Sequence, residues 1–196
     1  MDPVSMSEIS FSRGYGPVRA DIFFPSSTLS GVSDVHDITY VQCAGDATLA
    51  FRTHHKSVVQ QGSYNLTGNF ATVFATGKGA AHIQLMDVTI QHSLRWRSAH
   101  DGFRVRDYRG TVMPGHMKVH YSNLRSATRD VTPAECQQSQ LNVDVNKYFN
   151  DNWRTLYEAI SPSVDYTFSA VFRDYMDALL QAVGPEIQAA CGDADP

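Results

Sequence analysis

The sequence predicts an α+β fold, a super-roll in which a strongly curved antiparallel β-sheet wraps around one long C-terminal α-helix. Apolar and polar residues alternate over most of the chain before residue 124, and from Val145 onward apolar residues return every three or four positions. Strands and helices do not alternate along the chain, which excludes doubly wound nucleotide-binding folds and barrels of alternating strands and helices. With 196 residues, 42% of them apolar, we expect a single domain over residues 1–196.

The N-terminal part of the chain predicts five strands. They are expected over residues 9–11, 18–24, 32–43, 46–54 and 58–74. A glycine-rich turn at 14–17 separates the first two, and Pro25 should end the second. Gly62 and Gly68 lie inside the last of these strands, where we expect bends or bulges of the kind that a strongly curved sheet requires.

The middle of the chain predicts three further strands, over residues 81–96, 102–109 and 111–121. The Thr-Gly-Lys-Gly segment at 76–79 is expected to separate the first of them from the strand before it. The apolar alternation then changes phase, which predicts a bulge near Met86 and Asp87. Asp101 and Gly102 carry the signal of a hairpin turn, and the polar stretch 124–140 is expected to be a loop.

The segment 141–187 predicts one long amphipathic helix, capped by Asn142 or Asp144 and stopped at Gly184-Pro185. The apolar phase continues across Pro162, so we expect a bend within a single helix there. The face from Asp144 to Asp165 alternates in charge and is interpreted as a solvated stripe. At a rise of about 1.5 Å per residue the segment would be on the order of 60 Å long, so the molecule should be elongated.

Charge and hydropathy argue against two classes of partner. The net charge of −4 and the absence of a run of Lys or Arg argue against nucleic acid. No apolar stretch reaches the roughly 18 to 20 residues that a membrane span needs. Met1 is not followed by a secretory leader, so the chain is expected either to be cytosolic or to have lost its leader.

No set of residues has the spacing of a catalytic or metal site, so we expect no enzyme activity, no metal and no cofactor. His116 and His120 lie four apart on a predicted strand, which puts them about 13 Å from each other, too far to share one ion. The Gly-Lys-Gly at 77–79 is followed by a strand, whereas a phosphate-binding loop leads into a helix.

The three cysteines are the disulfide candidates Cys43, Cys136 and Cys191. If the long helix is continuous, Cys136 and Cys191 lie near its opposite ends, too far apart for a bond whose Cα atoms must lie within about 7 Å. Cys43 is therefore the realistic partner for either of the other two. Asn65 begins an Asn-Leu-Thr glycosylation sequon, which is usable only in a secreted protein.

The apolar residues spread over strands and helix predict a hydrophobic tunnel between them, because a curved sheet wrapped on a long helix is hard to fill at native density. The alternative is a filled core. The residues expected to line the tunnel are Tyr64, Leu66, Phe70, Ile83, Leu85, Trp153, Leu156, Ile160, Val164 and Phe168. A polar ligand head would need a hydrogen-bond donor, for which Tyr64, Tyr157 or a histidine is available.

The opening of the predicted helix also carries a motif. Residues 145–153 read Val-Asn-Lys-Tyr-Phe-Asn-Asp-Asn-Trp and are followed by Pro162, a pattern that resembles the C-terminal signature of the insect takeout and juvenile hormone binding protein family. The strand at 62–68 resembles that family's Gly-x-Tyr-x-apolar-x-Gly strand, 77–79 resembles its Gly-x-Gly turn, and the Asp-Pro-Val at 2–4 is similar to its Asp-Pro-Leu. The resemblance covers essentially the whole chain.

The resemblance implies a secreted carrier of the tubular lipid-binding superfamily, whose tunnel takes an elongated hydrophobic small molecule such as a juvenile hormone-like terpenoid, a fatty acid or another lipid. Two alternatives stay open, a pigment-binding protein and an interaction module with a filled core that acts through its surface. Family members carry an N-terminal disulfide loop and short helix before the Asp-Pro motif, at which this chain begins. Without that element one end of the pocket should close differently, and a homodimer could cover the exposed apolar surface.

Overall fold

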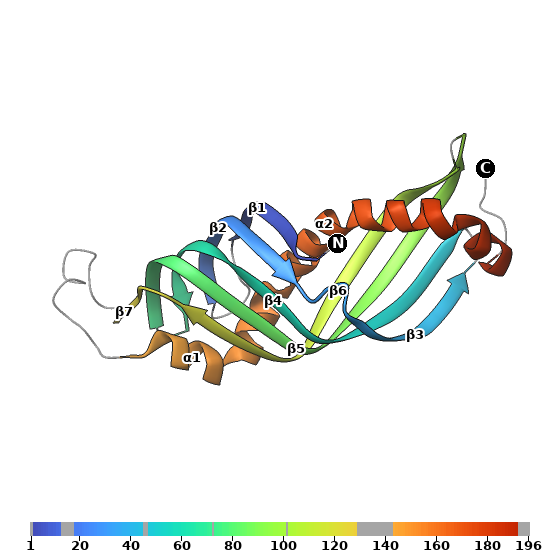
Figure 1. Cartoon of the computed structure of the whole chain (residues 1–196). Helices are drawn as coiled ribbons and strands as arrows, with labels where there is room; N and C mark the ends of the chain where they lie inside the picture. The colour runs from blue at the N-terminus through green and yellow to red at the C-terminus, as the bar shows by residue number, and fades with distance from the viewer. Residues whose placement is uncertain are drawn as a thin grey trace.

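The computed structural model describes residues 2–12, 18–44, 47–71, 73–100, 102–128 and 143–191. The described residues form a seven-stranded antiparallel sheet followed by two helices (Figure 1). The elements are β1 (Val4–Ser12), β2 (Val18–Ser30), β3 (Val35–Ala44), β4 (Thr48–Phe70), β5 (Val73–Ala99), β6 (Gly102–Tyr121), β7 (Leu124–Thr128), α1 (Val145–Asp151) and α2 (Trp153–Cys191).

Two very long strands, β4 and β5 with 23 and 27 residues, form the middle of the sheet. The strand order is β1-β2-β4-β5-β6, while β3 extends the sheet beside β4 and β7 beside β5. Helix α2 packs against both β6 and β1, the two ends of this order. The sheet therefore curls until both of its edges reach the helix, which confirms the predicted α+β super-roll.

Several predicted strand breaks are wrong. The strands expected over 46–54 and 58–74 are one strand, β4, and those expected over 102–109 and 111–121 are one strand, β6. The 76–79 segment lies inside β5, and the turn comes earlier, where Phe70 pairs with Val73. Gly77 is needed for a different reason, because a Cβ there would lie 2.6 Å from the hydroxyl oxygen of Tyr64.

Strand β2 also continues through Pro25, where an end was expected. A shift in its register with β4 between Phe23 and Ser26 accommodates the proline. Opposite this region, Gly62 and Gly68 let the two strands approach closely, since a Cβ on Gly68 would lie 2.4 Å from Ala20. These glycines thus serve the contact between strands, and the irregularity that was expected at them lies on the partner strand.

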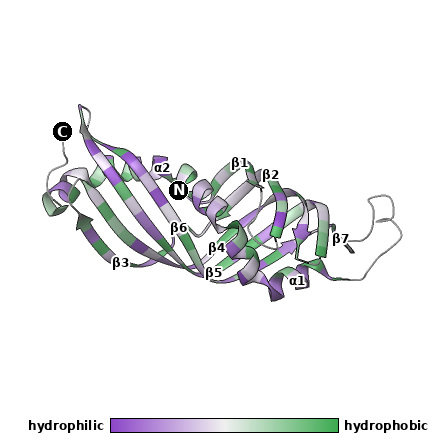
Figure 2. Cartoon of the chain, turned by 180° about the vertical axis from the view of Figure 1, so that it is seen from behind, coloured by the Kyte–Doolittle hydropathy of each residue, from purple (hydrophilic) through white to green (hydrophobic). Residues whose placement is uncertain are grey.

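The bulge predicted near Met86 and Asp87 is wrong, although the change of phase that suggested it is present. The buried positions shift from Ala81 to Val88, that is, from odd to even numbers, and Asp87 between them has a φ of 51°. No residue is inserted, because the register with β4 is the same on both sides. Figure 2 shows the apolar and polar residues alternating in bands along these strands.

The predicted single helix is divided in two. Asp144 is the N-cap of α1, and the helix is interrupted at Asn152, whose φ is −112° and ψ 22°. Helix α2 runs without interruption through Pro162, as predicted for one element. The expected stop at Gly184-Pro185 is instead a kink, because Val183 is non-helical and helical structure resumes up to Cys191.

A disulfide joins Cys43 of β3 to Cys191 at the end of α2, with 5.1 Å between the Cα atoms. This agrees with the expectation that Cys43 supplies one partner. Cys136 lies outside the described residues. The bond closes a separation of 148 residues and fixes the last turn of the helix to the edge of the sheet.

Side chains of both helices bind the backbone of β6. Asn146 and Asn150 each accept from a backbone N–H and donate to the same residue's carbonyl, at Tyr121 and Val119 respectively. Farther along, Asp165 accepts from Val112 and Asp177 from Val105. The interpretation of Asp165 as part of a solvated stripe is therefore wrong, since this carboxylate is half-buried against the sheet.

Candidate functional site

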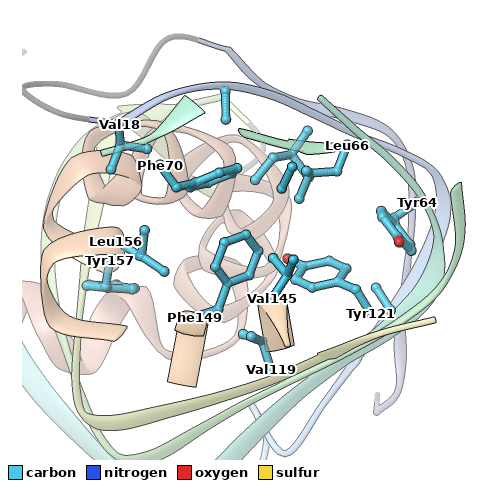
Figure 3. Close-up of a cluster of buried hydrophobic side chains, with 14 of the residues drawn as sticks. Val18, Tyr64, Leu66, Phe70, Val119, Tyr121, Val145, Phe149, Leu156 and Tyr157 are labelled. Atoms are coloured by element: carbon cyan, nitrogen blue, oxygen red, sulfur yellow. The ribbon is translucent and has the colours of Figure 1, made fainter. Parts of the chain in front are cut away.

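An apolar cavity of about 100 Å³ lies between the sheet and the first part of α2. Strands on both sides of the roll and both helices contribute to its wall. The lining residues are Phe11, Ile22, Phe24, Gln60, Phe70, Ile83, Leu85, Met117, Val119, Tyr121, Phe149, Leu156, Tyr157, Ile160 and Val164. Figure 3 shows side chains of this region, among them Phe70, Phe149 and Tyr121, converging inside the roll.

A second apolar cavity, of about 80 Å³, continues along α2. It is lined by Met6, Ile9, Phe11, Leu29, Val58, Gln60, Ile83, Leu85, Val88, Ile90, Val112, Val164, Thr167, Phe168, Val171 and Phe172. Five residues belong to both walls: Phe11, Gln60, Ile83, Leu85 and Val164. The two cavities therefore adjoin, and together they follow the long axis of the roll.

Most of the residues expected to line a tunnel border these cavities. Phe70, Ile83, Leu85, Leu156, Ile160 and Val164 border the first, and Phe168 borders the second. Tyr64 and Leu66 lie in the packed core and border neither cavity. Trp153 is half-buried, with its ring centroid 5.2 Å from that of His116.

The sequence prediction missed the contribution of the first two strands. Phe11, Ile22 and Phe24 line the first cavity, and Met6 and Leu29 line the second. Their signal was present, because Ile22 and Phe24 follow the same period-two alternation that predicted the strand. What the alternation does not show is which inward residues border open space.

Two tyrosine hydroxyls of this region already have acceptors. Tyr157 donates to the carbonyl of Val112 over 2.6 Å, and Tyr64 to that of Ser122 over 2.6 Å. Burial raises the pKa of Tyr157 and of Tyr121, so both phenols stay protonated. Gln60, which borders both cavities, donates to Ser27 over 3.3 Å. The cavity wall is thus mainly apolar, and two of its polar side chains, Tyr157 and Gln60, are hydrogen-bonded.

The described residues contain neither a cluster that could bind a metal ion nor a helix that could span a membrane. Within the described ranges no three His, Cys, Asp or Glu side chains lie together so that they could hold an ion. In the same part of the chain, no helix combines the length and the apolar character needed to cross a membrane. Asn65 of the sequon alternates with buried Tyr64 and Leu66, so it points away from the core of the roll.

Comparison with solved structures supports the fold. Takeout 1 from Epiphyas postvittana superposes with a TM-score of 0.64 at 12% sequence identity, over 94% of this chain and 77% of that chain. At this identity the likeness shows the fold alone. A lipopolysaccharide binding protein matches with a TM-score of 0.30 at 12% identity, over 91% of this chain and 36% of that chain, which is too low to carry an argument. No curated protein matches the sequence.

The sequence also matches a family model, described as haemolymph juvenile hormone binding protein, over residues 1–184. The match includes the strands and most of the helix that enclose the two cavities. This family consists of binding and carrier proteins rather than enzymes, and the match to the family model supports a general role as a carrier of hydrophobic ligands. The chain belongs to the haemolymph juvenile hormone binding protein family.

Proposed function

We propose that the protein carries one elongated apolar small molecule, a juvenile hormone-like terpenoid, a fatty acid or another lipid, along the axis of the roll. The observation that carries the proposal is the pair of adjoining apolar cavities. An apolar cavity of about 150 Å³ is enough to bind benzene. The cavities of about 100 and 80 Å³ are each smaller than that, so the proposed elongated ligand would occupy both and push side chains of the wall apart.

Burial of hydrocarbon would supply most of the affinity. Each Å² of apolar surface removed from water contributes about 25 cal/mol, from which the cost of association is subtracted. The proposed contact residues are those of the predicted set that border the cavities, with Ile83, Leu85 and Val164 in the middle of the ligand. Tyr64, Leu66 and Trp153 would support this wall from behind.

We also propose that the protein acts outside the cell. The family is described as a haemolymph family. The disulfide between Cys43 and Cys191 supports this, because disulfides persist mainly in oxidising compartments. A homodimer remains a prediction. It would cover exposed apolar side chains such as Ile38 and Val41 of β3, and sedimentation at several protein concentrations would detect it.

Native mass spectrometry of the freshly purified protein tests the carrier function. We expect a co-purified apolar mass, or, after delipidation, binding of a fluorescent fatty acid that a juvenile hormone analogue or an unlabelled fatty acid displaces. The chemically denatured protein is the control for non-specific probe binding. Absence of a co-purified mass together with absence of probe binding in the folded state would instead support a filled core. A coloured preparation would point to a pigment as the ligand.

A further inference from the structure

A chain of four buried polar side chains crosses three strands near the second cavity. Thr53, His55, His92 and Tyr108 are each between 4% and 6% exposed. The Thr53 hydroxyl lies 2.8 Å from Nε2 of His55 and 2.9 Å from Nε2 of His92, and the Tyr108 hydroxyl lies 2.9 Å from Nδ1 of His92. Such a network in an apolar region is expensive unless its members are paired.

The three hydrogen bonds allow two proton arrangements, and we infer the one in which the phenol proton of Tyr108 has His92 as its acceptor. Burial raises the pKa of Tyr108, so its phenol keeps its proton and can donate to Nδ1 of His92. His92 then carries its proton on Nε2 and donates to Thr53, and the Thr53 hydroxyl donates to Nε2 of His55. In this arrangement the proton of His55 sits on Nδ1.

Nδ1 of His55 is buried and makes no hydrogen bond of normal geometry within the described residues. Burial lowers the pKa of His55, while the nearby backbone of Gly31 and Asp34 acts to raise it, as carbonyl oxygens close to a ring N–H do. This agrees with a proton on Nδ1. The network therefore ends in a buried Nδ1–H group that makes no regular hydrogen bond and lies near the backbone of Gly31 and Asp34.

The register of the sheet places this end of the network directly behind the wall of the second cavity, although none of its four residues lines either cavity. His55 is paired with Val88 and Thr53 with Ile90 across β4 and β5, and Val88 and Ile90 both line that cavity. Directly paired residues have neighbouring side chains on the same face. The ring of His92 lies 6.5 Å from that of Phe168, which also borders the cavity.

We propose that Thr53, His55, His92 and Tyr108 form a polar subsite that takes a neutral oxygen-bearing head group of the ligand, a hydroxyl, ester or ketone, with Nδ1–H of His55 as the donor. The inference rests on the proposed carrier function. Tyr64 and Tyr157, the other candidates for head-group recognition, already donate to backbone carbonyls. A carboxylate is disfavoured, because a charge buried beside neutral imidazoles has no partner.

Competition binding with ligands of equal chain length tests the subsite on the intact protein. A long-chain alcohol, the methyl ester, the carboxylate and the alkyl chloride each displace a fluorescent apolar probe. We expect the alcohol and the ester to bind about 3- to 10-fold more tightly than the chloride, the range of one net hydrogen bond. Equal affinities for all would overturn the subsite and leave the carrier function standing, whereas failure of every ligand to bind would overturn the carrier function.

Two matched threonine variants locate the effect. Thr53→Val removes the hydroxyl that fixes the proton of His55 and should abolish the preference for the alcohol over the chloride. Thr39→Val removes a hydroxyl that lies 2.8 Å from Nε2 of His54, a neighbouring histidine outside the network, and should keep the preference. Loss of the preference in both variants, or in neither, would contradict the assignment.

Histidine side-chain NMR of the unmodified protein gives a readout that does not depend on variants. Long-range ¹H–¹⁵N correlations report which ring nitrogen carries the proton. We expect the alcohol, but not the chloride, to shift the Nδ1 signal of His55. Identical spectra with both ligands would show that the network only holds β4, β5 and β6 together.

Discussion

Oδ1 of Asp165 on α2 lies 2.9 Å from the backbone nitrogen of Val112 on β6 and accepts its hydrogen bond. The Tyr157 hydroxyl donates a hydrogen bond to the carbonyl of Val112, so both backbone groups of Val112 are paired with side chains of the helix. An edge strand normally leaves such groups open to other chains. In this fold the long helix covers them with its own side chains.

Two substitutions of Asp165 distinguish the contribution of its hydrogen bond to stability from that of its charge. Burial raises the pKa of Asp165, although the Val112 bond lowers it in part. Folding thus disfavours the ionised carboxylate, so the protein loses stability as the pH rises through the pKa of Asp165 in the folded state. We expect Asp165→Ala to cost about 1 kcal/mol at neutral pH and Asp165→Asn, whose amide oxygen still accepts, to cost nothing or to stabilise. Urea denaturation checks this, and equal losses in both variants would contradict it.

The asparagine motif of α1 should be important for stability. The Asn150 side chain accepts a hydrogen bond from the N–H of Val119 and donates one to its carbonyl, over 2.8 and 3.0 Å, as the next strand of a sheet would. Asn150→Ala leaves these groups without their partner, and we expect a loss of about 1 to 3 kcal/mol in the free energy of unfolding. Lys147→Ala is the matched control on the same helix, because it breaks only an exposed ion pair with Asp151. A similar unfolding midpoint for both variants would rule out this role.

Acid should destabilise the fold through its buried histidines. Burial, with a smaller effect of His55, lowers the pKa of His92 to about 4, from 6.5 in an exposed site. The folded state therefore needs the neutral ring, and stability is lost as the pH falls from about 6.5 to about 4, by on the order of 3 kcal/mol. Denaturation across this range should show a reduced loss for His92→Gln and an unchanged loss for His54→Gln. An unchanged loss in His92→Gln would assign the effect to other groups.

Much of the fold could be predicted because it depends on local periodicity. The alternation in 18–24 and the change of phase at Asp87 both correspond to the structure. Some of the errors came from glycine and proline read as chain breaks. Gly77 makes room for the Tyr64 hydroxyl of β4, and a shift in the register between β2 and β4 accommodates Pro25. In both cases the cause is the partner strand, which the local sequence does not show.

The cavity was less accessible to sequence analysis. Periodicity placed Leu66 and Phe70 on the same inward face, yet of the two only Phe70 borders the apolar cavities. The difference depends on the curvature of the sheet, which no local pattern contains. The buried network could not be assembled either, because Thr53 and His92 are 39 residues apart and meet only through the register of β4 and β5.

Reducing the disulfide should loosen the end of α2. In the chain-entropy model, a bond that closes 148 residues stabilises the folded state by up to about 5 kcal/mol. We expect a reductant or Cys43→Ser to lower the unfolding midpoint, and the reductant to have no further effect on Cys43→Ser. Thermal unfolding by circular dichroism measures both. An additional loss when the variant is reduced would show that another thiol contributes.

Val164 is the residue at which the two cavities can be separated. It is half-buried on α2 and borders both. Val164→Phe places a ring at their junction, which a ligand that occupies one cavity can avoid and a ligand that spans both cannot. Since overpacking typically costs 1 to 3 kcal/mol, we expect affinity for a long-chain fatty acid or alcohol to fall by about 5- to 150-fold. A short analogue should lose less than about 3-fold, because it needs only one cavity.

Tyr166→Phe, at a side chain 78% exposed on the same turn, is the control and should bind both ligands like the unmodified protein. Equal losses for the short and the long ligand would mean that the two cavities do not hold one continuous chain.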